Sequence, residues 1–130
     1  MRRKALVVED DDSTRVLLVK LVQTQCCDVD EARDGAIAIE LLDANDYDVI
    51  LLDIALPKVS GTDIMDHLFA TNPAALERTI VVTGLNIEEL RKLFPTLCHT
   101  VPKPVIPKRL QDSIHRCLLR IPADEFLTSA

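Results

Sequence analysis

A run of four apolar residues closed by an acid, Val49-Ile50-Leu51-Leu52-Asp53, stands near the middle of this 130-residue chain. An unbroken apolar run is typical of a strand buried on both faces, because a strand with one solvated face alternates apolar and polar residues. The run Ala5-Leu6-Val7-Val8 is also closed by acids, and the run Ile80-Val81-Val82 ends at Thr83-Gly84. Strands of this kind belong to parallel sheets covered by helices on both faces.

Longer amphipathic segments separate these runs and predict helices. We expect one helix capped by Asp11, Asp12 or Ser13 and running to about Gln25. Other helices are expected over residues 36–43, 62–70, 87–93 and 107–121, and further strands at 26–32 and 98–101. Strands separated by helices cannot form hairpins, so their connections are right-handed crossovers between parallel strands. The sequence therefore predicts an α/β fold, a doubly wound five-stranded parallel sheet flanked by five helices.

Composition indicates which kinds of partner and which cellular compartment to expect. The formal net charge is −6 and aromatic residues make up 3% of the chain, which disfavours direct binding of nucleic acid. No apolar run approaches the ~20 residues of a membrane span, so we expect no membrane insertion. The four cysteines lack the spacing of a zinc site and are interpreted as small buried residues in a reducing cytoplasm. They are Cys26, Cys27, Cys98 and Cys117.

Polar side chains follow the predicted strands at the edge where the carboxyl ends of parallel strands meet, which is where open α/β sheets bind ligands. Glu9 and Asp10 follow the first strand and Asp53 follows the third. Thr83 ends the fourth, and Lys103 follows the fifth. Neighbouring carboxylates repel unless a cation joins them, and oxygen ligands suit Mg²⁺. Asp53 could then act as a nucleophile that forms an acyl phosphate, with Lys103 and Thr83 as donors to the phosphoryl group.

Four segments carry a resemblance to a known family. They are Leu6-Val7-Val8-Glu9-Asp10, Val49-Ile50-Leu51-Leu52-Asp53-Ile54-Ala55-Leu56-Pro57, Val82-Thr83-Gly84 and Pro102-Lys103-Pro104. In their order and spacing, the chain resembles the receiver domain of two-component response regulators, and in length the single-domain chemotaxis type. The resemblance implies a flavodoxin-like (βα)5 fold with strand order 2-1-3-4-5. It places a receiver domain at residues 1–121 and leaves 122–130 as a short tail or the start of a linker.

The resemblance also implies a metal site for Mg²⁺ (or Mn²⁺). Asp10 matches a direct ligand that acts together with Asp53, and Glu9 matches the acid that reaches the ion through water. The backbone carbonyl of Ala55 matches the remaining ligand from the protein.

A phosphorylation site is implied at the same edge. Asp53 matches the phosphoacceptor, and Thr83 and Lys103 match the residues that contact the phosphoryl group and report its presence. Pro104 follows that lysine in the family, often through a cis peptide bond. The donor would be a histidine kinase or a histidine phosphotransfer protein, and the downstream protein partner is unknown. Thr100 departs from the family, which usually has Tyr or Phe there, so activation would be transmitted without rotation of an aromatic ring.

The predicted helix that runs to about Gln25 offers a candidate docking surface for the partner kinase. Val16 and Val19 are apolar positions beside the leucines that we expect to face the core, which are Leu17, Leu18 and Leu21. The alternative is that they are scattered surface residues without a binding role.

Two other functions stay open on the sequence. The first is an interaction-only pseudo-receiver that is not phosphorylated. The second is an aspartyl-phosphate hydrolase of the haloacid dehalogenase type, which needs a second acid two residues after the nucleophile, where this chain has Ala55. We expect that the chain is not an enzyme that acts on other molecules. It would instead be a substrate of phosphorylation that assists its own phosphorylation and dephosphorylation.

Overall fold

The computed structural model describes residues 3–25, 27–56, 59–84, 88, 92 and 99–119. Its elements are β1 (Arg3–Val8), α1 (Asp12–Gln23), β2 (Cys27–Ala32), α2 (Gly35–Ala44), β3 (Val49–Leu52), α3 (Gly61–Thr71), the 3₁₀ helix η1 (Pro73–Arg78), β4 (Thr79–Thr83), β5 (His99–Pro102) and α5 (Pro107–Leu118). The predicted helix over 87–93 lies outside the described residues except for Glu88 and Lys92, which are helical. The predicted tail, 122–130, also lies outside them.

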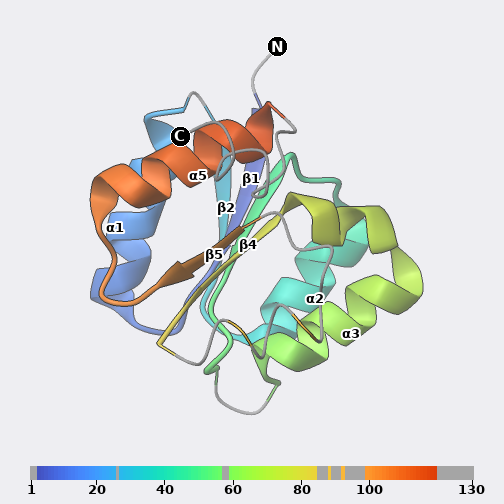
Figure 1. Ribbon diagram of the computed structural model, residues 1–130. Coiled ribbons are helices and arrows are strands. Elements are labelled where there is room, and N and C mark those ends of the chain that lie inside the picture. Colours follow the sequence, from blue (N-terminus) through green and yellow to red (C-terminus); the bar gives the residue numbers. More distant parts are fainter. Residues whose placement is uncertain are drawn as a thin grey trace.

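The strands form one parallel sheet in the order β2-β1-β3-β4-β5. This order confirms the predicted doubly wound, flavodoxin-like fold. Helices α1 and α5 lie on one face of the sheet, and α2 and α3 lie on the other (Figure 1). Among the described helices, none combines the length and the apolar character that crossing a membrane requires.

The unbroken apolar run of β3 is divided between two separate cores. Val49 and Leu51 pack in the cluster that includes α1 and α5. Ile50 and Leu52 pack in the cluster that includes α2 and α3. Side chains alternate across a strand, so each of the two covering layers needs its own apolar set. Because both faces of β3 are covered by helices, the strand carries no polar residue.

Helix α1 begins at one of the predicted caps. Asp11 is the N-cap, and its carboxylate accepts hydrogen bonds from the backbone N–H of Thr14 at 2.8 Å and from its hydroxyl at 2.7 Å. The hydrogen bond from the Thr14 hydroxyl, and then the one from its backbone N–H, hold the pKa of Asp11 below its ordinary value. Because Asp11 is the cap, α1 begins only two residues after Asp10.

Candidate functional site

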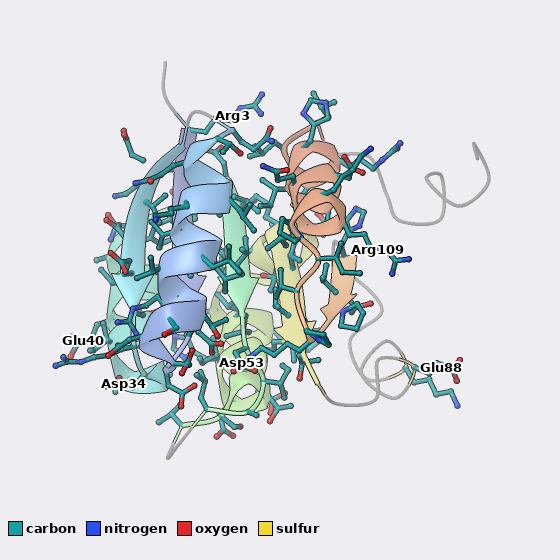
Figure 2. All side chains as sticks on the ribbon, turned by 90° about the vertical axis from the view of Figure 1, so that its left-hand side faces the viewer. Arg3, Asp34, Glu40, Asp53, Glu88 and Arg109 are labelled. Carbon is teal, nitrogen blue, oxygen red and sulfur yellow. The ribbon has the colours of Figure 1, made fainter. Side chains whose placement is uncertain are left out.

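The candidate site lies at the carboxyl ends of the strands. Figure 2 places Asp53 at this end of the sheet and Arg3, the first residue of β1, at the opposite end. The backbone N–H of Asp53 donates to the carbonyl oxygen of Val8 at 3.1 Å, and the N–H of Lys103 donates to the carbonyl oxygen of Thr83 at 2.9 Å. Hydrogen bonding between the strands thus extends to the functional residues and holds their backbones in register.

Lys103 joins two of the predicted acids. Its Nζ donates to Oε1 of Glu9 at 2.8 Å and to Oδ2 of Asp53 at 3.0 Å. Burial alone would lower the pKa of Lys103, but the two carboxylates raise it above its ordinary value. The lysine is therefore a charged donor fixed between residues that lie 94 and 50 positions away in the sequence.

The two acids differ in their affinity for protons. Glu9 is fully buried, and this burial, together with the neighbouring Asp53, raises its pKa to about 7 although Lys103 acts in the opposite direction. Burial would also raise the pKa of Asp53, but hydrogen bonds with Glu9 and Lys103 lower it below its ordinary value. In the metal-free site, Glu9 therefore gains a proton near neutral pH while Asp53 stays ionised.

Three of the predicted ligands converge as a group that fits a divalent cation. One carboxylate oxygen from each of Glu9, Asp10 and Asp53 lies within 4.8 Å of the others. Among the described residues, no donor reaches the buried Oε2 of ionised Glu9, so this oxygen is an acceptor in need of a partner. Carboxylate oxygens are the ligands that Mg²⁺ takes in proteins. The donor set and the unsatisfied oxygen both favour a hard cation at this position.

The remaining predicted residues surround this group. The backbone N–H of Ala55 donates to Oδ1 of Asp53 at 3.1 Å, which places Ala55 beside the carboxylate. Thr83 is fully buried at the end of β4, next to β3. Gly84 is exposed, and a Cβ there would meet no atom within 4 Å, so the space beside its backbone is open. The Lys103–Pro104 peptide bond is cis, as the family resemblance implies.

Two residues that support the site were not recognised as such from the sequence. Nη1 of Arg15 donates to the carbonyl oxygen of Glu9 at 3.0 Å. The other is Gly61, where a Cβ would lie 2.5 Å from Cα of Ile54 and 2.6 Å from the carbonyl oxygen of Asp53. Its lack of a side chain lets the start of α3 pack against the backbone that carries Asp53.

The sequence matches a known protein family over most of its length. The family described as the response regulator receiver domain matches residues 5–115. The transcriptional regulatory protein CpxR of Escherichia coli is 30% identical over 117 residues, which cover 90% of this chain and 50% of CpxR. A cyclic di-GMP phosphodiesterase of Thermotoga maritima is 36% identical over 87 residues, which cover 67% of this chain and 23% of that protein. The chain thus spans about a quarter to a half of the length of these curated relatives.

Solved structures share the fold. A CheY-like response regulator receiver domain protein from Methanospirillum hungatei has a TM-score of 0.80 and 22% identity, with all of both chains covered. The BeF3-activated receiver domain of DrrB, a Thermotoga maritima protein, has a TM-score of 0.78 and 28% identity, covering 92% of this chain and 99% of that one.

Proposed function

Because this chain belongs to the response regulator receiver domain family, we propose that it accepts a phosphoryl group on Asp53. The observation that carries the proposal is the contact of Lys103 Nζ with both Glu9 and Asp53 at the edge where the strands end. A nucleophilic carboxylate, a fixed cation and a group of metal-ligating oxygens are the parts that transfer of a phosphoryl group to an aspartate requires.

The proposed reaction uses a phosphohistidine on a histidine kinase or a histidine phosphotransfer protein. A carboxylate oxygen of Asp53 attacks the phosphorus, the P–N bond breaks, and the imidazole leaves with the electron pair of that bond and takes up a proton. An acyl phosphate on Asp53 is the product. Lys103, Thr83 and the backbone N–H of Gly84 stabilise the negative oxygens of the phosphoryl group.

We propose that Glu9, Asp10, Asp53 and the carbonyl of Ala55 hold Mg²⁺ (or Mn²⁺). The ion would neutralise charge that develops on the transferred group. The close approach of three carboxylate oxygens and the unsatisfied Oε2 of Glu9 support this assignment. The receiver domain of DrrB, which shares the fold, has a BeF3-activated form, and this supports a phosphoacceptor role for the present chain.

Receiver domains are generally substrates of phosphorylation and not enzymes on other molecules, and we infer that role for residues 1–121. The phosphorylated domain would change its affinity for a downstream protein in the cytoplasm. Thr100 is half-buried in β5, where it pairs with Val81. Since no ring is present at Thr100, we propose that the change passes through β4 and β5 themselves.

The exposed apolar side chains of α1 support a docking surface for the phosphodonor. Val16 is 50% exposed, and Ile106, just before α5, is 49% exposed. Leu17, which the sequence predicts to face the core, is instead 37% exposed. Val19, which the sequence places with Val16, is partly buried against the core and does not belong to this surface.

The test is incubation with a small phosphodonor and Mg²⁺, followed by intact mass spectrometry. We expect the wild type to gain one phosphoryl group and Asp53→Asn to gain none. Asp66→Asn is the matched control, because Asp66 is an exposed acid of α3 away from the strand ends. No gain by the wild type would contradict the proposal and favour the interaction-only function.

A further inference from the structure

Arg15 of α1 links three segments of the chain. Its Nη1 donates to the carbonyl oxygen of Glu9 at 3.0 Å. Its Nη2 contacts Oδ1 of Asp12 in the first turn of the same helix, and its Nε lies 3.3 Å from Oε1 of Glu31 in β2. Only 15% of the Arg15 side chain is exposed. The planar guanidinium is therefore held on three sides, and its geometry suits several acceptors at once.

The carbonyl that Arg15 contacts belongs to the peptide that joins Glu9 to Asp10. On the other side of Glu9, its backbone N–H donates to the carbonyl oxygen of Ala32 at 3.0 Å. Strand pairing thus holds Glu9 before the peptide, and Arg15 holds the peptide itself. Asp10 is exposed, so the position of its carboxylate depends on the backbone from which it extends.

We propose that Arg15 is a positioning residue for the divalent cation: by fixing the Glu9–Asp10 peptide, it keeps the Asp10 carboxylate within reach of the oxygens of Glu9 and Asp53. The inference rests on the proposed metal site and adds to it a residue that touches neither the ion nor the phosphoryl group. Residues that orient the ligands of a metal in this way commonly change its affinity by 10- to 100-fold.

Removing Arg15 would have two effects on cation affinity, and they have opposite signs. The arginine is a cation near a cation site, and its charge is offset by Asp12 and Glu31. Replacing it with methionine leaves these two acids without their partner, and the added negative charge alone would tighten the binding of a divalent cation. Without the bond from Arg15, the Glu9–Asp10 peptide would no longer be held in place, and the binding of the cation would weaken. The sign of the change therefore separates the two effects.

The experiment measures Mn²⁺ binding by electron paramagnetic resonance of the free ion, with Mg²⁺ as competitor. We expect Arg15→Met to bind Mn²⁺ on the order of tenfold more weakly than the wild type. The double variant Arg15→Met/Glu31→Gln keeps the net charge of the wild type, and we expect it to be weakened similarly. Glu31→Gln alone keeps the bond from Arg15 to Glu9 and should stay within about twofold of the wild type, as a small change of exposed charge implies.

Arg15→Lys provides a second variant if Arg15→Met fails to fold. Lysine keeps the charge, but its single nitrogen cannot reach all three acceptors in the same way, so we expect weaker Mn²⁺ binding here too. Unchanged or tighter binding in the folded Arg15 variants would overturn this inference and leave the proposed phosphorylation of Asp53 untouched. Absence of Mn²⁺ binding by the wild type would overturn the metal site and this inference together.

Discussion

At the scale of single residues, the proton on Glu9 connects the site to the stability of the fold. Its pKa rises from 4.5 to about 7 because burial, and then Asp53, disfavour its charge. Between these values the folded chain binds more protons than the unfolded chain, so the free energy of unfolding falls as pH rises. Asp53 acts in the opposite sense and only at lower pH, because its pKa is lowered from 3.8.

We expect Glu9→Gln to remove this pH dependence in the metal-free protein. The neutral side chain cannot titrate, so the wild type should lose roughly 1–3 kcal/mol more than the variant between pH 4.5 and pH 7. Urea unfolding at a series of pH values measures the difference. Glu40→Gln, at an exposed position on α2, is the control and should follow the wild type. Equal slopes for Glu9→Gln and the wild type would contradict the shifted pKa of Glu9.

At the scale of elements, the strands were predictable because burial on both faces demands unbroken apolar runs. The start of α1 was predicted only to within three candidate caps, Asp11, Asp12 and Ser13. Each of these side chains can accept the capping bond, and only the backbone conformation selects Asp11. Helix η1 was not predicted at all. Six residues of 3₁₀ helix are too few to establish a periodic apolar pattern.

The junction of β3 with α3 depends on the absence of a side chain at Gly61. We expect Gly61→Ala to lower the free energy of unfolding by roughly 1–3 kcal/mol, because its Cβ would overlap the backbone of Asp53 and Ile54. It should also slow phosphorylation by displacing Asp53. Gly84→Ala is the matched control for stability, since a Cβ there meets nothing within 4 Å. Urea unfolding compares the two variants, and equal losses of stability would refute the proposed close packing.

At the scale of the whole molecule, the convergence of Glu9, Asp53 and Lys103 was predictable because parallel strands bring their carboxyl ends to one edge. Topology alone determines this, and no side-chain geometry is needed. The role of Arg15 was not predictable in the same way. Its contact with Glu9 depends on how far and at what angle α1 lies from β1 and β2, which no local pattern in the sequence encodes.

Binding of Mg²⁺ should stabilise the entire domain, since a ligand that binds only the folded state shifts the unfolding equilibrium. At a concentration of 100 times its Kd, Mg²⁺ would add about 2.7 kcal/mol, a rise in Tm of several degrees. We expect Asp10→Ala to lose this rise and Lys103→Ala to keep it, because only Asp10 is proposed as a ligand. Differential scanning calorimetry measures both. A full rise in Asp10→Ala would show that the ion binds elsewhere.

Because the sheet divides the core in two, the two outer helical layers can change in sequence separately. One apolar cluster packs between the sheet and helices α1 and α5, and the other packs between the sheet and helices α2 and α3. The sheet separates the two clusters. Substitutions that do not touch each other add their effects nearly independently. Either outer layer can therefore be rebuilt for a new partner over generations while the opposite layer is inherited unchanged. The exceptions are Arg15 of α1 and Gly61 of α3, which contact the backbone of the site residues.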